Sequence, residues 1–273
     1  MTSQTNPIMG YKPTITITKK TQQMKAPPME RLPITQQNIG AFLADFPDHQ
    51  QRYELALSHV AGLNVADVAC GAGYGAAMLA KSANKVSGFD IDKATINHAN
   101  KHFAAANCSF YHADKMSKNG PYDVITSFET LEHMSESDGD EFLKTLLANL
   151  KKGGKLILST PMNEGPHKHN TTPFHVREYS HAELAAKLAA NGFTVQEWYG
   201  QSNAVTRQIN PTMMKSGIHR LVPSPVRQLV KKVMFGDIAT KARQDVKLTK
   251  ADMTSAFVQI AICTKVTGFT FYI

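Results

Sequence analysis

The chain has 273 residues, a net charge of +8, and 42% hydrophobic and 19% charged residues, a balance that excludes a wholly disordered or membrane-embedded protein. No apolar run approaches the roughly 18 residues of a membrane span, and the first residues lack the apolar core of a signal peptide. Three widely spaced cysteines favour reduced thiols over a disulfide framework. These features together predict a cytoplasmic protein.

The elements expected in chain order begin after a tail. Residues 1–36 are rich in Thr, Gln, Lys and Pro and are predicted to be partly disordered, whereas residues 37–200 form a core that opens with two lead-in helices. Strand and helix patterns then alternate, which predicts a parallel sheet with helices on both faces. The expected strands are 64–69, 85–89, 109–112, 123–127, 155–159, 193–198 and 256–264. Helices are expected from about 75, from about 93, from 129 onward, at 138–150 and at 181–190.

The segment VADVACGAGYG, residues 65–75, is the most informative motif. An apolar strand breaks into three glycines, Gly71, Gly73 and Gly75, where a helix begins. Glycines allow a tight turn and close approach of a ligand to the main chain, and free N–H groups at a helix N-terminus stabilise negative charge. The spacing alone also fits a dinucleotide fingerprint, so the neighbouring residues must decide between the two cofactors.

Two of three carboxylates near this turn favour S-adenosylmethionine over a dinucleotide. Asp90 ends the second strand, where an acid accepts hydrogen bonds from ribose hydroxyls of either cofactor. Asp67 lies within the first strand, where it would repel a pyrophosphate but attract an ammonium or a sulfonium. Asp114 follows the third strand and would accept a hydrogen bond from an adenine amino group.

With these motifs in order, the chain resembles the class I S-adenosylmethionine-dependent methyltransferases over roughly residues 52–198. The segments that carry the likeness are VADVACGAGYG, VSGFDID, FYHADKM, YDVITSFETLEHM, LKKGGKLILSTP and HVREYSHAEL followed by NGF. The resemblance implies an α/β, Rossmann-like, seven-stranded sheet, mostly parallel with an antiparallel last strand. It also implies that Arg52 reaches the methionine carboxylate and that the cofactor touches the main chain near Phe128. The predicted cofactor-binding residues are therefore Arg52, Asp67, Gly71, Gly73, Asp90, Asp114 and Phe128.

An acid and histidine cluster follows the fourth strand. If a helix starts there, Glu129, Glu132 and His133 project from one face at i, i+3 and i+4, and His175 in PFHVREYS is a candidate fourth ligand. Such a set suits a divalent ion, Mg²⁺ or Mn²⁺, that would orient a substrate hydroxyl. It resembles the Glu-x-x-Glu-His motif of ubiquinone-biosynthesis O-methyltransferases and of small-RNA 2′-O-methyltransferases. Two alternatives stay open: Glu129, His133 and His175 act as metal-free catalytic groups, or the cluster is structural.

The basic surplus is concentrated in residues 201–250, which carry ten Lys or Arg against two acids and are predicted to be a helical insertion that covers the substrate. Residues 224–235 have the spacing of a basic amphipathic helix. It is interpreted as a lid with solvated lysines, or as a contact for an anionic acceptor or an anionic membrane surface. No nucleic-acid module is recognised, which disfavours a nucleic-acid partner. Residues 251–273 are expected to hold the last strand and the end of the core.

These observations predict an S-adenosylmethionine-dependent O-methyltransferase. It would transfer a methyl group to a hydroxyl of a sugar, a glycan or another small molecule, with or without assistance from a divalent metal. One alternative is an RNA 2′-O-methyltransferase, whose RNA binding would depend steeply on salt. Another is a methyltransferase-like binding protein without turnover, and NAD-linked oxidoreduction is a distant fourth. Oligomeric state and the identity of the acceptor cannot be derived from the sequence.

Overall fold

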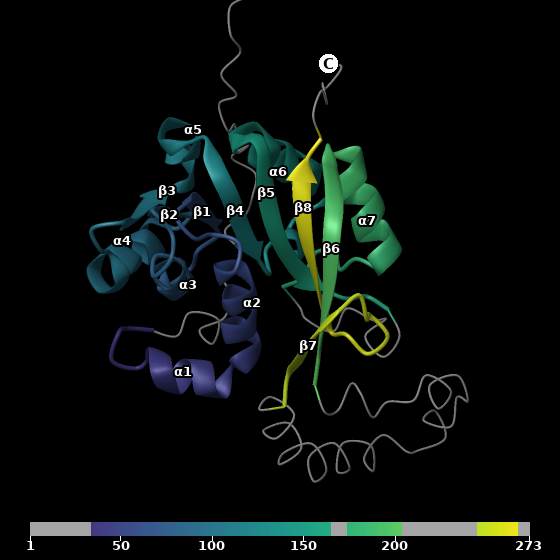
Figure 1. The fold of residues 1–273 in the computed structure, drawn as a ribbon, viewed down its shortest axis with the longest axis horizontal. Helices are drawn as coiled ribbons and strands as arrows, with labels where there is room; N and C mark the ends of the chain where they lie inside the picture. Colours follow the sequence, from purple (N-terminus) through teal and green to yellow (C-terminus); the bar gives the residue numbers. More distant parts are fainter. Residues whose placement is uncertain (1–33, 165–173, 204–244, 267–273) are drawn as a thin grey trace, which may run out of the picture.

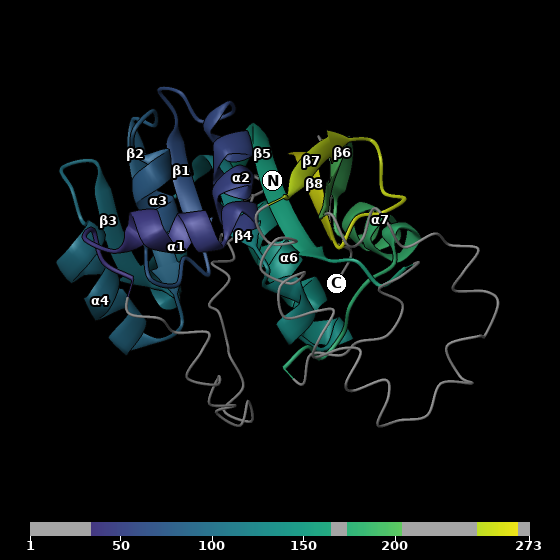
Figure 2. The same cartoon turned by 90° about the horizontal axis from the view of Figure 1, so that it is seen from below.

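The computed structural model describes residues 34–164, 174–203 and 245–266. Its strands form one sheet with helices on both faces (Figures 1 and 2). The strands are β1 Asn64–Val68, β2 Lys85–Asp90, β3 Cys108–His112, β4 Tyr122–Phe128, β5 Leu150–Pro161, β6 Phe193–Ser202, β7 Lys247–Lys250 and β8 Val258–Lys265. The α-helices are α1 Ile39–Asp45, α2 Pro47–Leu57, α3 Tyr74–Leu79, α4 Lys93–Phe103, α5 Met116–Asn119, α6 Glu136–Asn149 and α7 His181–Ala190. Short 3₁₀ turns lie at Ala113–Lys115 and Leu131–His133.

The sheet has the order β3-β2-β1-β4-β5-β8-β6-β7. The first five strands in this order pair in parallel, and β8 pairs antiparallel with both β5 and β6. Strand β1 is therefore an inner strand: β2 and β3 are added on one side of it, and β4 and β5 on the other. The carboxyl ends of β1, β2 and β4 meet at one edge, which is where ligands bind in open α/β sheets.

Two apolar cores, one on each face, hold the layers together. On one face α1 to α4 pack against side chains such as Val65, Val86 and Ile157, and on the other α5, α6 and α7 pack against Ile125 and Leu158. Strands β1, β2, β4 and β8 are buried on both faces over most of their length, because successive side chains point to opposite sides of a doubly covered sheet. None of the helices in the described residues is long and apolar enough to cross a membrane.

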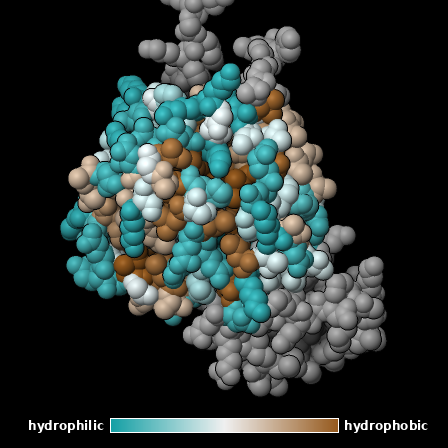
Figure 3. Space-filling view, in the orientation of Figure 1, coloured by the Kyte–Doolittle hydropathy of each residue, from teal (hydrophilic) through white to brown (hydrophobic). Residues whose placement is uncertain are grey.

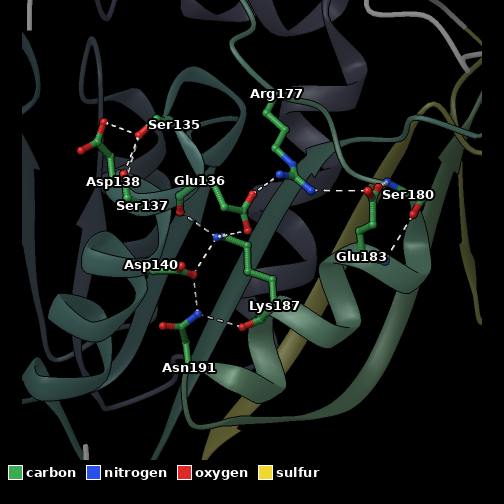
Figure 4. A network of polar contacts seen from close by, with 10 residues as sticks. All are labelled: Ser135, Glu136, Ser137, Asp138, Asp140, Arg177, Ser180, Glu183, Lys187 and Asn191. Atoms are coloured by element: carbon green, nitrogen blue, oxygen red, sulfur yellow. Dashed lines mark hydrogen bonds and ion pairs between the residues drawn. The ribbon is translucent and has the colours of Figure 1, made fainter. Parts of the chain in front are cut away.

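Helices α6 and α7 are also joined by a charged network (Figure 4). The side chain of Lys187 on α7 is only 4% exposed, and its Nζ donates to Asp140 at 2.7 Å and to Glu136 at 2.9 Å. Asn191 donates to the same Asp140 carboxylate at 2.8 Å. Because a buried ammonium is costly without partners, these acids compensate Lys187 and fix α7 against the start of α6.

The prediction of seven strands is wrong, because the sheet has eight. The additional strand, β7, lies at the end of the predicted basic insertion, and its Lys247 pairs with Ser202 of a β6 that runs four residues beyond the expected end. Both ends of the intervening segment therefore leave the sheet side by side. Residues 204–244, including the predicted basic helix 224–235, lie outside the described residues, as do residues 1–33 of the predicted tail.

The lead-in helix α2 covers the glycine turn through Tyr53. A Cβ on Gly75 would lie 1.8 Å from Cζ of the Tyr53 ring, so only glycine lets this ring sit against the start of α3. Gly73 has a φ of +94°, and a Cβ there would meet Ala99 and Phe110 at 2.8 Å. The face of the molecule drawn in Figure 3, in the orientation of Figure 1, is mostly hydrophilic, and apolar residues reach the surface near its centre.

Replacing Gly75 with Ala is expected to destabilise the protein by roughly 1–3 kcal/mol, the usual cost of overpacking, because the Tyr53 ring must move. Gly40 in α1 is the matched control, since a Cβ there meets nothing within 4 Å, and Gly40→Ala should be neutral or stabilise by up to about 1 kcal/mol. Urea unfolding measures both. Equal stabilities of the two variants would contradict this packing.

Candidate active site

The glycine turn after β1 is shaped by the carboxylate at the end of β2. Gly71 has a φ of +53° and Ala69 a φ of +61°, both in the left-handed region. The Asp90 carboxylate accepts the N–H of Gly71 at 3.1 Å and the N–H of Asp92 at 2.9 Å. The predicted residues Gly71, Gly73 and Asp90 thus lie together at the carboxyl edge, where main-chain groups can approach a ligand closely.

Asp67 is the buried acid of this edge, with 1% of its surface exposed. Its Oδ1 accepts the Thr126 hydroxyl at 2.7 Å and its Oδ2 accepts the Tyr53 hydroxyl at 3.3 Å. Burial raises the pKa of Asp67 to about 7, although the two hydroxyls favour the ionised form; the nearby Asp90 adds to the rise. Both donors are neutral, so a cation placed against this carboxylate would gain an uncompensated negative charge.

Asp114 and Phe128 lie on either side of this centre. The Asp114 side chain is 55% exposed, and its carboxylate lies 3.0 Å from Nδ1 of His112 and 3.6 Å from Nζ of Lys115, which places it at the solvent rim. Phe128 ends β4, and its ring meets the edge of the Tyr53 ring with centroids 5.0 Å apart. Asp114 is therefore accessible to a ligand from solvent, whereas Phe128 is partly buried beside Tyr53.

Arg52, which the resemblance places near the methionine carboxylate, is held between α2 and β6. The residue is 2% exposed, and its guanidinium donates to Asp48 of α2 at 3.2 Å and to Gln201 of β6 at 2.9 Å. The neighbouring Gln51 donates to the carbonyl of Val246 at 2.8 Å, just before β7. In this structure Arg52 therefore ties α2 to β6, close to where the basic segment leaves and rejoins the sheet.

Three of the four predicted metal-ligating residues come together. One ligand atom from each of Glu132, His133 and His175 lies within 4.8 Å of the others, and the two imidazole rings are 5.2 Å apart. Glu132 is 1% exposed; its Oε2 accepts the Thr160 hydroxyl at 2.9 Å, and its Oε1 has no hydrogen-bond partner in the described part of the chain. Burial, with a further contribution from Glu129, raises the pKa of Glu132 well above its ordinary value.

Glu129 lies outside this group of three. The helix expected from residue 129 is absent: Glu129 has a φ of +50°, a 3₁₀ turn follows at Leu131–His133, and α6 begins only at Glu136. The Glu129 carboxylate instead accepts the Ser159 hydroxyl at 2.7 Å. A non-glycine residue in the left-handed region is strained, and such residues gather at functional sites, but a sequence pattern does not reveal the conformation.

Two residues near the site were missed by sequence reasoning. Ile91 follows Asp90 directly and is 70% exposed, which is unusual for a large apolar side chain beside a buried strand end. Glu178 is nearly buried and its carboxylate lies 2.5 Å from Nδ1 of His175. The signals were present, an apolar residue after a strand-end acid and an acid three positions after a histidine, but both are common without function.

The sequence is similar to one described protein family and to individual proteins. A family model described as a methyltransferase domain matches residues 40–197. The chain is 30% identical over 177 residues, 62% of its length and 68% of the relative's, to a Mycolicibacterium smegmatis protein described as an S-adenosylmethionine-dependent methyltransferase. It is 35% identical over 104 residues to a ubiquinone biosynthesis O-methyltransferase of Coxiella burnetii, covering 36% of the chain and 44% of that protein.

Among solved structures, the cyclase SpnF superposes with a TM-score of 0.52 and 19% identity, covering 81% of each chain. At this identity the likeness concerns the fold alone.

The raised pKa of Asp67 predicts a pH-dependent stability. The folded state keeps the proton that the unfolded state loses above its pKa of 3.8, so this contribution is complete below pH 3.8 and is lost as pH rises through about 7. Asp67→Asn cannot ionise. From pH 5 to pH 8 the stability of the variant relative to the wild type should therefore rise by roughly 2–3 kcal/mol. Urea unfolding at both pH values measures this difference, and a constant difference would refute the assignment.

Proposed function

Because the chain belongs to the class I S-adenosylmethionine-dependent methyltransferase family, we propose that it is an O-methyltransferase whose acceptor is a hydroxyl of a sugar, a glycan or another small molecule. The observation that carries the oxygen preference is the group Glu132, His133 and His175, in which one buried oxygen of Glu132 has no hydrogen-bond partner among the described residues. The partial sequence match to a ubiquinone biosynthesis O-methyltransferase also supports methyl transfer to oxygen.

The residues at the carboxyl edge fit S-adenosylmethionine. Asp67 offers a buried carboxylate bonded only to neutral hydroxyls in the described residues, which suits the ammonium of the methionine moiety. Asp90 suits the ribose hydroxyls, and the exposed apolar face of Ile91 suits the adenine ring. When bound, the cofactor supplies a methyl group already activated on a sulfonium, so the protein's task is mainly to position the acceptor.

The acid and histidine group fits a divalent ion. The chemistry of its donors, one carboxylate and two imidazoles, is that of transition-metal sites. Oε1 of Glu132 is buried, has no hydrogen-bond partner in the described residues and lies 4.0 Å from Nε2 of His133. A cation there would offset the charge of Glu132, and the residues that would hold it are Glu132, His133 and His175. Mn²⁺ or Mg²⁺ would supply Lewis-acid polarisation of the acceptor hydroxyl. Glu129 lies close enough for its charge to raise the pKa of Glu132. We propose that Glu129 contacts the acceptor as a catalytic group.

The acceptor class is tested by incubating the protein with methyl-labelled cofactor and cell extract fractionated into glycans, lipids, quinones and RNA, with and without a chelator. Label that enters an ether-linked methyl of a sugar or small molecule is the expected result. Label found only in RNA, or only in methyl groups on nitrogen or carbon, would contradict the proposal.

The metal assignment predicts that Glu132→Gln and His133→Ala lose Mn²⁺ binding. Each removes a proposed ligand, so the affinity should fall by more than the roughly 10–100-fold that loss of an outer contact costs, while S-adenosylhomocysteine still binds. Electron paramagnetic resonance of free Mn²⁺ gives the affinity. Glu141→Gln, an exposed acid on α6, is the control. Wild-type protein that binds no Mn²⁺, or a Glu132→Gln variant that binds it normally, would contradict the assignment.

A further inference from the structure

The carboxylate of Glu178 contacts the imidazole of His175. Its side chain is 8% exposed, its Oε1 lies 2.5 Å from Nδ1 of His175, and no other hydrogen bond or ion pair of this carboxylate occurs among the described residues. Placing an acid in a nearly buried position with a single partner is costly. The contact with His175 therefore explains why an acid occupies this nearly buried position.

This contact determines where the proton of His175 lies. An ionised carboxylate only accepts hydrogen bonds, so Nδ1 of His175 must carry the proton and, in the neutral ring, the lone pair is on Nε2. The same reasoning applies to His133, whose Nδ1 lies 3.1 Å from the carbonyl oxygen of Phe174. Both histidines of the group are thus assigned the Nδ1–H tautomer, which is the rarer form in water and needs an acceptor to hold it.

The segment that carries His175 is anchored without Glu178. The N–H groups of Val176 and Arg177 donate to the carbonyl of Glu132 at 2.8 and 3.0 Å. The guanidinium of Arg177 forms ion pairs with Glu136 and Glu183 (Figure 4). These contacts set the position of the main chain against the turn at Leu131–His133, so Glu178 is left to orient the ring.

We propose that Glu178 is a positioning residue that holds His175 as the Nδ1–H tautomer and thereby completes the ligand group with Glu132 and His133. The proposal rests on the proposed function in one respect, namely that His175 serves the acceptor site. Carboxylate partners of this kind fix the orientation and raise the basicity of metal-binding histidines generally. Glu178 acts through His175 and is not assigned a contact with substrate.

The first test is the tautomer, read from long-range ¹H–¹⁵N spectra of histidine-labelled full-length protein. The wild type should show His175 protonated on Nδ1. Glu178→Leu removes the acceptor and should shift His175 toward the Nε2–H form, whereas Glu178→Gln keeps an amide oxygen and should retain much of the Nδ1–H form. Glu183→Gln is the matched control, because it alters the Arg177 contact in the same segment and should leave the tautomer unchanged.

The second test is Mn²⁺ affinity of the same variants. Glu178→Leu should weaken binding roughly 10–100-fold, with Glu178→Gln intermediate and Glu183→Gln near wild type. A wild-type His175 in the Nε2–H form, or a tautomer that ignores Glu178→Leu, would overturn the proposal. If the wild type binds no Mn²⁺ but the tautomer follows Glu178, the metal assignment fails and the positioning role of Glu178 stands.

Discussion

The buried carboxylate of Asp67 is the constraint around which the catalytic edge is built. Its two oxygens join the lead-in helix α2, through the Tyr53 hydroxyl, to the adjacent strand β4, through Thr126. The Tyr53 ring can take this place only because residue 75 is glycine. Helix α2 is thus held over the turn, and Arg52, the residue before Tyr53, donates a hydrogen bond to Gln201 of β6. Asp67 therefore joins β1 to β4 and to α2, and α2 in turn contacts β6.

A second buried acid, Glu132, repeats the arrangement after β4. Like Asp67 it is 1% exposed, accepts a hydroxyl and has a raised pKa caused first by burial. Two acids that are costly to ionise in the folded protein weaken its stability, a common feature of sites arranged for binding. Their proposed partners are both cations, an ammonium at Asp67 and a divalent ion at Glu132. On this proposal, the carboxyl edge receives positive charge at both acids.

Much of the fold could be predicted because the strands are short apolar runs separated by glycine and helix-cap signals. The helix His181–Ala190 has its expected bounds because Ser180 and Glu183 form a capping box and Gly192 follows. Strand β7 could not be predicted, since its Lys-Leu-Thr-Lys pattern becomes a strand only by pairing with β6. Likewise the left-handed backbone of Glu129 and the pairing of Glu178 with His175 arise from tertiary contacts, which local spacing does not encode.

The most direct measurement of the central claim is proton release on cofactor binding, by calorimetry at pH 6 in buffers of different ionisation enthalpy. With a pKa of about 7, Asp67 is largely protonated in the free protein, and an ammonium against it favours the ionised form. S-Adenosylhomocysteine should therefore release close to one proton, whereas 5′-methylthioadenosine, which has no ammonium, should release none, and Asp67→Asn should abolish the difference. Equal proton exchange for both ligands in the wild type would contradict the account.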